Sequence, residues 1–193
     1  MDHRLRLRSL LVERSLTIGD FTLAGGARSS YYIDARRTTM SAEGQFLVGS
    51  VAYRALRDHE LEFSWVGGLT LGADPISYAI AHRSWMEGDP IEAFTVRKRA
   101  KLHGLGQRIE GGLPSATPVV VVEDSMTSGS SALEAVRVVE EHGASVAAVL
   151  TLVDRQAGGG EAIREAGYPL VAIYTADELL AAEGPAQVQT GGD

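Results

Sequence analysis

The segment VVVVEDSMTSGSS, at positions 119–131, decides the fold. Its four consecutive valines predict a strand that is buried on both faces, as in a parallel sheet. Two acids, Glu123 and Asp124, follow the strand, and a helix over 131–142 is expected next, ending at Gly143. Because open α/β sheets bind ligands beyond the carboxyl ends of their strands, this segment predicts a binding site.

The polar turn predicted over 123–130 has the composition of a phosphate site. Hydroxyl side chains surround Gly129 at the start of the predicted helix, where free N–H groups and the helix dipole favour an anion. The carboxylates of Glu123 and Asp124 would repel a phosphate but can accept hydrogen bonds from sugar hydroxyls. We therefore expect a sugar phosphate, and the Walker pattern of P-loop proteins is missing. The alternative, a strand end followed by an ordinary capping turn, explains each residue singly but not the order of the whole segment.

The rest of the chain alternates helix-like and strand-like segments, which is typical of a parallel α/β sheet. The helices are predicted over 4–14, 42–57, 74–86, 161–166 and 177–182, and the strands over 63–66, 92–96, 145–153 and 170–175. We expect a single domain over 1–183, followed by a small, polar and disordered tail over 184–193.

Composition excludes several classes of protein. The chain has 193 residues, enough for one domain with a substantial core. Its 18 basic and 25 acidic residues give a net charge of -7, which disfavours general binding to nucleic acid or to an anionic membrane. It contains no cysteine, hence no disulfide, thiolate nucleophile or cysteine-based zinc site. No targeting signal or membrane-length apolar stretch of roughly 20 residues stands out, so a cytoplasmic location is expected.

The segment RKRAKLHGLGQRIEGG, at positions 97–112, interrupts the alternation. It contains four glycines and no sustained apolar period, and long loops of this kind in compact domains are often functional. Its five Lys and Arg side chains, which accompany His103, include Lys98 and Lys101, the only two lysines of the chain. A solvated basic loop is the alternative, but the pairing of both lysines here favours a role that arginine cannot fill, because lysine is a compact point charge.

The segment at 119–131 resembles the phosphoribosyl pyrophosphate motif of type I phosphoribosyltransferases. Four more segments resemble orotate phosphoribosyltransferases, in that family's order: FTLAGGARSSYYIDAR (21–36), GGLTLGADPI (67–76), VRKRAKLHG (96–104) and VDRQ (153–156). The resemblance implies the type I phosphoribosyltransferase fold, with a central, mostly parallel sheet flanked by helices. It also implies a small N-terminal hood, mainly from 1–40, and a mobile catalytic loop at 97–112.

The resemblance implies roles for individual residues. The catalytic set would be Lys101, His103 and Asp124, with Lys101 nearest the chemistry. The orotate contacts would be Thr127, Arg155, Tyr32 and Ile33, with Arg155 facing the orotate carboxylate. The contacts with phosphoribosyl pyrophosphate would be Arg97, Lys98, Lys101 and His103 on the diphosphate, Glu123 and Asp124 on the ribose, and Thr127, Ser128, Gly129, Ser130 and Ser131 on the 5-phosphate. Ser125 and Met126 would also belong to this donor site.

The resemblance further implies transfer of the 5-phosphoribosyl group to N1 of orotate, giving orotidine 5-phosphate and diphosphate in de novo pyrimidine (UMP) synthesis. Mg²⁺ would arrive on the diphosphate without a direct protein ligand. A homodimer is implied, with the catalytic loop closing over the neighbouring subunit's site. No nucleic-acid or membrane partner is expected.

The sequence departs from the family pattern at two positions that hold lysines in some members. Ala24 replaces one of them, and Leu71-Gly72 replaces a Tyr-Lys pair. In those members the lysine at the position of Ala24 reaches the diphosphate. The loss of both lysines is expected to affect the affinity for the donor more than the type of reaction, since Arg28 or another residue could substitute. Two alternatives remain open: a type I phosphoribosyltransferase for a purine or another base, and a non-enzymatic regulator of this fold that binds nucleic acid.

Overall fold

The computed structural model describes residues 1–22, 26, 28–99 and 108–183. Its helices are α1 (His3–Ser15), α2 (Arg36–Thr39), α3 (Ala42–Asp58), α4 (Ala73–Met86), α5 (Ser130–Glu141), α6 (Gly159–Glu165) and α7 (Ala176–Glu183). Its strands are β1 (Leu16–Thr22), β2 (Arg28–Ile33), β3 (Trp65–Leu69), β4 (Glu92–Val96), β5 (Ile109–Glu110), β6 (Pro118–Met126), β7 (Ser145–Asp154) and β8 (Leu170–Thr175).

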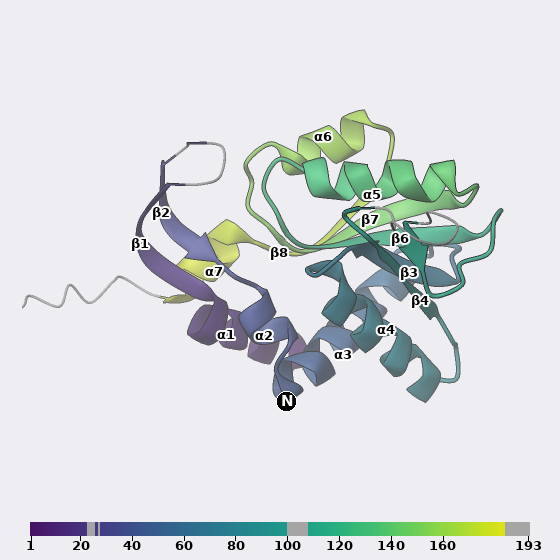
Figure 1. The fold of residues 1–193 in the computed structure, drawn as a ribbon. Helices are drawn as coiled ribbons and strands as arrows, with labels where there is room; N and C mark the ends of the chain where they lie inside the picture. The colour runs from purple at the N-terminus through teal and green to yellow at the C-terminus, as the bar shows by residue number, and fades with distance from the viewer. Residues whose placement is uncertain (23–25, 27, 100–107, 184–193) are drawn as a thin grey trace, which may run out of the picture.

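The central sheet has the strand order β5-β4-β3-β6-β7-β8. Its strands are parallel except for β5, which runs antiparallel to β4. Helices α5 and α6 lie on one side of the sheet, and α3 and α4 on the other (Figure 1). The predicted α/β fold with a mostly parallel central sheet is therefore confirmed.

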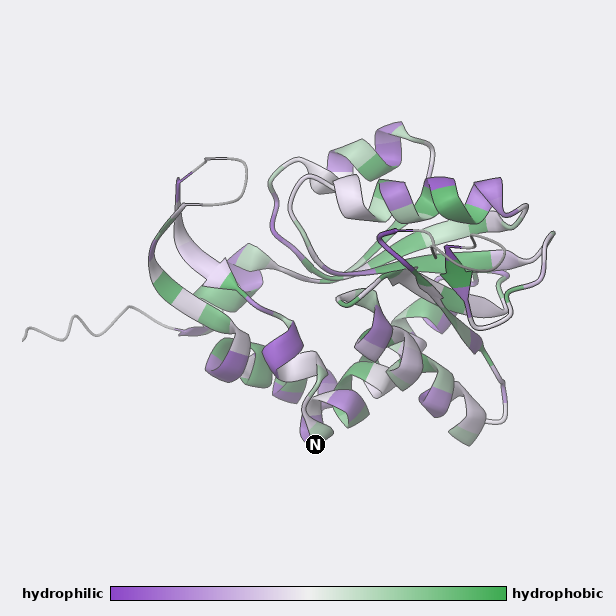
Figure 2. Ribbon diagram, in the orientation of Figure 1, coloured by the Kyte–Doolittle hydropathy of each residue, from purple (hydrophilic) through white to green (hydrophobic). Residues whose placement is uncertain are grey.

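The valine strand sits at the centre of the sheet and divides two hydrophobic clusters. Val120 and Val122 pack with residues of α1, α3 and α4, whereas Val119 and Val121 pack with residues of α5. Figure 2 shows the apolar colouring concentrated on these central strands. All four valines are buried, as expected for a strand covered on both faces.

The strand predicted over 63–66 was placed too early in the chain. The observed strand, β3, includes Gly67 and Gly68, which the sequence pattern put after the strand. A Cβ atom at Gly67 would collide with the Phe94 carbonyl, and one at Gly68 with the Val122 carbonyl. The glycines are thus part of the strand because its neighbours approach too closely for side chains.

A separate two-stranded antiparallel sheet, β1–β2, forms the hood with α1 and α2 (Figure 1). The sequence predicts no strands here, because the hairpin is largely exposed and its hydrophobic alternation is weak. The hood is tied to the end of the sheet: the Tyr174 hydroxyl donates to the Arg4 carbonyl at 2.6 Å, and the Arg4 guanidinium donates to the Ile173 carbonyl. This contact holds the hairpin beside the carboxyl end of the sheet.

The segment at 97–112 is not entirely a loop. Ile109 and Glu110 form β5, which pairs with Val96 and Thr95 of β4, so the expectation of no regular structure was wrong at this end. Two residues are too few to show a strand period in the sequence. Lys101 and His103 lie outside the described residues, as does the tail over 184–193.

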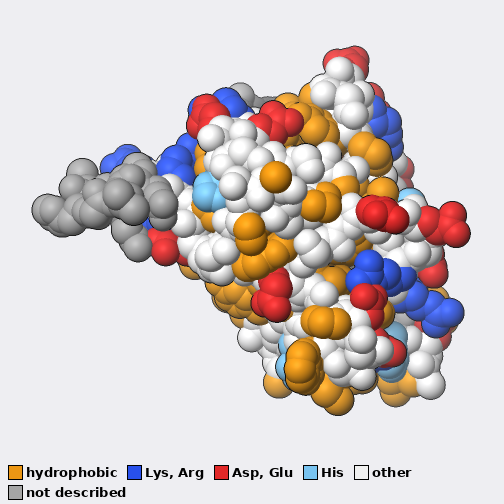
Figure 3. All heavy atoms as spheres, turned by 90° about the vertical axis from the view of Figure 1, so that its right-hand side faces the viewer, with side chains coloured by type: hydrophobic (Ala, Val, Ile, Leu, Met, Phe, Trp, Pro, Cys, Tyr) orange, Lys and Arg blue, Asp and Glu red, His pale blue; other side chains and the backbone are white. Residues whose placement is uncertain are grey.

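The outer surface mixes charge signs and apolar side chains. On the face drawn in Figure 3, basic side chains lie beside acidic ones, with hydrophobic groups between them. Along α4, Tyr78, His82, Trp85 and Met86 are exposed at the spacing of one helical face, with Trp85 73% and Met86 70% accessible. Among the described helices, none is long and apolar enough to cross a membrane.

Candidate active site

Strand β6 extends beyond its neighbour β3 and carries the two acids with it. Its pairing with β3 ends at Val121, whereas its pairing with β7 continues to Met126. Glu123 and Asp124 therefore lie inside the strand, and the turn predicted from residue 123 starts only at Thr127. The sequence placed the strand end at the last valine, but backbone pairing with β7 does not require apolar side chains.

A cavity of about 280 Å³ opens at this edge of the sheet. It brings together most of the side chains predicted to bind substrate, from four separate segments of the chain. The predicted residues that line it are Tyr32, Ile33, Lys98, Glu123, Asp124, Ser125, Thr127, Ser131 and Arg155. The residues that were not predicted are Asp34, Arg36, Leu69, Thr70, Leu71 and Gly72.

The two acids share a half-buried environment. Burial, together with the adjacent Asp124 carboxylate, raises the pKa of Glu123 to about 8, against a smaller opposing effect of Lys98. Burial also raises the pKa of Asp124, although the Ser125 N–H, which donates to its Oδ1 at 2.9 Å, and Arg36 lower it. Hydroxyl donors or cations that enter the cavity would favour the ionised form of these acids, and a carboxylate accepts hydrogen bonds more strongly than a protonated carboxyl.

The turn between β6 and α5 presents backbone N–H groups to the cavity edge. Gly129 adopts a left-handed conformation (φ 76°) directly before α5 and offers no side chain to cap the helix. Gly159 packs against this turn: a Cβ atom there would lie 2.7 Å from the Thr127 carbonyl oxygen. The turn is thus held by close backbone contact, and the Ser128 hydroxyl donates to the Ser130 hydroxyl at 3.1 Å. The first N–H groups of α5 lie at a helix N-terminus, where an anion is favoured.

The turn between β3 and α4 forms the opposite wall. Asp74 accepts hydrogen bonds from the Thr70 hydroxyl at 2.6 Å and from the Thr95 hydroxyl at 2.8 Å. These bonds tie the turn to β4. Gly72 lies against the acid pair, because a Cβ atom at this position would be 2.6 Å from Asp124 Oδ1. At Gly72 the wall therefore presents backbone rather than a side chain to the acid pair.

A second cavity, of about 470 Å³, adjoins the first and shares Thr70 and Lys98 with it. Arg97 lines only this second cavity and lies 3.4 Å from the Glu110 carboxylate. Arg108 donates to the backbone carbonyls of Arg97 and Lys98 and pairs with Glu134 of α5 at 2.5 Å. Both described ends of the segment at 97–112 are thus fixed at the rim of the site, and three of their cations, Arg97, Lys98 and Arg99, line the second cavity.

The side of the cavity beyond β7 carries Arg155. Its guanidinium lies 5.0 Å from the centre of the Tyr31 ring, and the Tyr31 hydroxyl donates to its carbonyl at 3.4 Å. Tyr32, on the opposite face of β2, packs against Phe21 with ring centres 5.6 Å apart. The hairpin thus supplies one tyrosine to orient the arginine and another to line the cavity.

Some predicted contacts are placed differently. Met126 is 1% exposed and belongs to the core, so its side chain does not reach the cavity; its carbonyl accepts from the Arg155 N–H. Ser128, Gly129 and Ser130 lie in the turn, outside the cavity lining. In the described part of the chain, no group of three or more His, Cys, Asp or Glu side chains could hold a metal ion.

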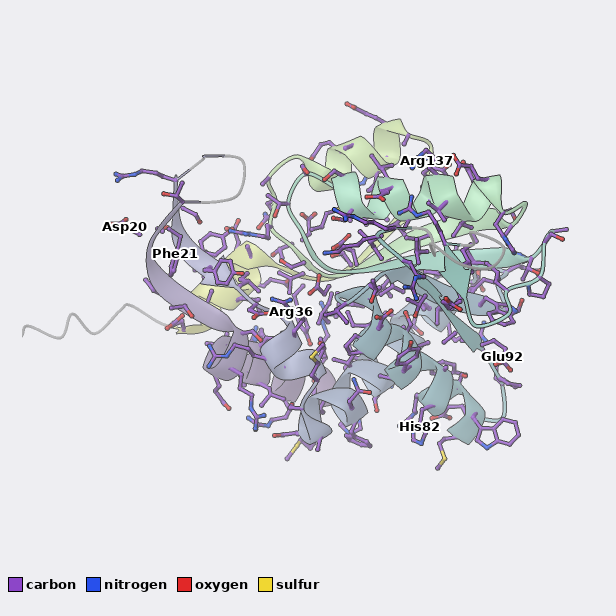
Figure 4. All side chains as sticks on the ribbon, viewed as in Figure 1. Asp20, Phe21, Arg36, His82, Glu92 and Arg137 are labelled. Atoms are coloured by element: carbon purple, nitrogen blue, oxygen red, sulfur yellow. The ribbon has the colours of Figure 1, made fainter. Side chains whose placement is uncertain are left out.

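Arg36 and Asp34 were missed as site residues. Arg36 lies between the hood and the sheet, as Figure 4 shows. The signal in the sequence is that Asp34 and Arg36 lie at the end of the segment at 21–36, which resembles the family. No local pattern indicates which side chains of this segment face the cavity.

No protein-family model matches the chain, but curated proteins of known name align with more than 90% of it. The chain is 43% identical over 183 residues to an orotate phosphoribosyltransferase of Aquifex aeolicus, covering 93% of this chain and 99% of the relative. It is 45% identical over 179 residues to that of Streptomyces coelicolor, covering 92% and 97%.

Solved structures agree. Orotate phosphoribosyltransferase of Mycobacterium tuberculosis with Fe(III) dicitrate superposes with a TM-score of 0.81 at 42% identity, covering 92% of this chain and 98% of that one. The same enzyme in complex with 5-phospho-alpha-D-ribosyl 1-diphosphate superposes with a TM-score of 0.77 at 38% sequence identity, with the same coverage of both chains. Shared identity over almost the full length, together with the acid pair, the hydroxyl turn and Arg155 around one cavity, places the chain in the orotate phosphoribosyltransferase family.

Proposed function

We propose that the protein transfers the 5-phosphoribosyl group of phosphoribosyl pyrophosphate to N1 of orotate, forming orotidine 5-phosphate and diphosphate for UMP synthesis. The observation that carries this proposal is the single cavity in which Glu123, Asp124, Lys98 and Arg155 meet. The named relatives, and the M. tuberculosis enzyme bound to the same donor, support it.

The chemistry divides among the walls of the cavity. The C1–O bond of the donor breaks and its electron pair leaves with the diphosphate. N1 of orotate gives its proton to the departing diphosphate and supplies the electron pair for the new C1–N1 bond. Glu123 and Asp124 accept hydrogen bonds from the ribose hydroxyls, and residues 127–131 hold the 5-phosphate. Lys98 and the turn at 70–72 receive the diphosphate, whose growing charge needs preorganised donors.

Orotate fits the opposite side of the cavity. Arg155 faces the orotate carboxylate, since a guanidinium binds a carboxylate through two parallel hydrogen bonds. Tyr31 restricts the arginine from behind, and Tyr32 and Ile33 supply the surface for the ring. By resemblance to the family, Lys101 and His103 would bind the diphosphate of the donor. Lys101 would lie nearest the reacting bond.

We propose that Mg²⁺ is required and enters bound to the diphosphate. Magnesium prefers phosphate oxygens and water, with few protein ligands. When bound, it would neutralise part of the leaving group's charge. Omitting Mg²⁺ from the assay, with Ca²⁺ as a size control, tests this requirement.

A cytoplasmic homodimer completes the proposal. The exposed stripe on α4, formed by Tyr78, His82, Trp85 and Met86, supports a protein contact, because large apolar patches on a soluble domain favour association. Light scattering during gel filtration should give twice the mass of 20.5 kDa, and Trp85→Lys should shift the mass toward that of one chain.

The decisive experiment is orotate-dependent release of diphosphate from phosphoribosyl pyrophosphate with Mg²⁺. Uracil, which lacks the carboxylate, and adenine serve as competing bases. Orotate should be preferred strongly, and Arg155→Gln should raise the KM for orotate without changing that for the donor. Preference for a base without a carboxylate would overturn the assignment, and binding of RNA or DNA without turnover would favour a regulator.

A further inference from the structure

Arg36 enters the cavity from the hood. As the first residue of α2, it lines the same cavity as Glu123, Asp124 and Lys98. Its Nε donates to Asp34 Oδ1 at 2.8 Å and so holds the pKa of Asp34 below its ordinary value. The two Nη groups donate to no other described residue. The side chain is therefore oriented by one bond and keeps its remaining donors for a ligand.

Helix α2 is fixed to the β3 side of the site. Gln45 of α3 donates from its Nε2 to the carbonyl of Thr39, the last residue of α2, and to the carbonyl of Pro75 at 2.9 Å. Pro75 lies in the first turn of α4, three residues after Gly72. Arg155, by contrast, follows β7, on the other side of β6. Arg36 thus belongs to the half of the cavity formed by the turn before α4.

The half of the cavity formed by the turn before α4 has a glycine, Gly72, at a position where a cationic side chain could stand. Some members of the family have a lysine there, but in this chain Asp124 Oδ1 lies 2.6 Å from where the Cβ atom of a side chain would stand. Arg36 acts electrostatically on the same carboxylate: it lowers the pKa of Asp124. Arg28, the other arginine considered as a replacement, is exposed at the start of β2 and does not line the cavity.

We propose that Arg36 is a substrate-binding residue for the diphosphate of the donor and supplies the charge that position 72 lacks. This inference rests on the proposed function. The diphosphate is attached at C1, next to the ribose hydroxyls that Glu123 and Asp124 accept. An arginine beside Asp124 on the β3 side would thus reach the leaving group rather than the base. Charge-assisted bonds from a prearranged guanidinium strengthen as the leaving group gains charge.

The test compares Arg36→Gln with Arg37→Gln, a matched control at the next residue of α2, which is exposed and does not line the cavity. Calorimetry with Mg²⁺-diphosphate should show a Kd raised about 10- to 100-fold by Arg36→Gln, the range expected for a charge-assisted pair. The KM for the donor should rise in parallel, and the KM for orotate should stay within about twofold. Arg36→Lys should recover part of the diphosphate affinity.

An unchanged diphosphate Kd in Arg36→Gln would overturn the inference. So would a selective rise in the KM for orotate, which would place Arg36 in the base site. Because calorimetry needs no turnover, the two proposals can fail separately. A protein that binds Mg²⁺-diphosphate through Arg36 but ignores orotate would refute only the assignment of the base. Orotate-dependent turnover of Arg36→Gln with the parent's KM for the donor and the parent's Kd for Mg²⁺-diphosphate would refute only the role of Arg36.

Discussion

Glu123→Gln should make the protein more stable at alkaline pH while impairing its reaction. The pKa of Glu123 is raised from 4.5 to about 8, chiefly by burial and then by Asp124. Below pH 4.5 the carboxyl is protonated in both the folded and the unfolded chain, so it costs nothing. Between pH 4.5 and 8 only the unfolded chain gives up the proton freely, and the free energy of unfolding falls as the pH rises.

The size of the effect follows from the same shift. If the whole rise in the pKa of Glu123 were converted to free energy at about 1.36 kcal/mol per pH unit, the loss in unfolding free energy would be nearly 5 kcal/mol. The carboxyl faces an open cavity, and water screens it there, so we expect roughly 1–3 kcal/mol. Glutamine keeps the shape and cannot ionise. The difference in unfolding free energy between Glu123→Gln and the parent should thus be small at pH 5 and reach this value at pH 8.5.

The assay is urea denaturation at pH 5, 7 and 8.5, followed by fluorescence. Glu165→Gln, at the exposed end of α6, is the control and should show no pH-dependent difference. Glu123→Gln should also weaken donor binding about tenfold or more, because a ribose hydroxyl loses a charged acceptor. If the unfolding free energies of Glu123→Gln and the parent changed with pH in parallel, the reasoning would be refuted. Such a result would mean that ionisation of Glu123 does not destabilise the folded protein.

Three further predictions address the walls of the site. Gly68→Ala should lower the unfolding free energy by about 2–4 kcal/mol in urea, because its Cβ meets the Val122 backbone. Gly72→Ala would place a Cβ atom 2.6 Å from Asp124 Oδ1, so it should displace this carboxylate and raise the donor Kd about fivefold or more in calorimetry. Asp74→Asn should lower kcat/KM for the donor about tenfold, and normal kinetics would exclude a positioning role. Lys101→Ala should depress turnover about 100-fold or more at unchanged Tm, and near-normal turnover would contradict its role.

Much of the fold could be predicted because its strongest signals are local. Consecutive valines mark a central strand, and periodic apolar residues mark the long helices on each side. The β1–β2 hairpin was missed because exposed strands carry little apolar alternation, and β3 was misplaced because glycines usually end strands. In both cases the deciding contact, with the sheet edge or with Phe94 and Val122, comes from residues distant in sequence.

By itself, the sequence determined the α/β class, the acid pair and the hydroxyl turn, because each is encoded within a few consecutive residues. It also determined the family, since five motifs follow one another in order. Only the tertiary structure decided that β6 extends beyond β3, that Met126 faces the core, and that Arg36 enters the cavity beside Asp124. Those outcomes depend on the register of neighbouring strands and on how the hood docks, which long-range packing fixes and local residue patterns do not encode.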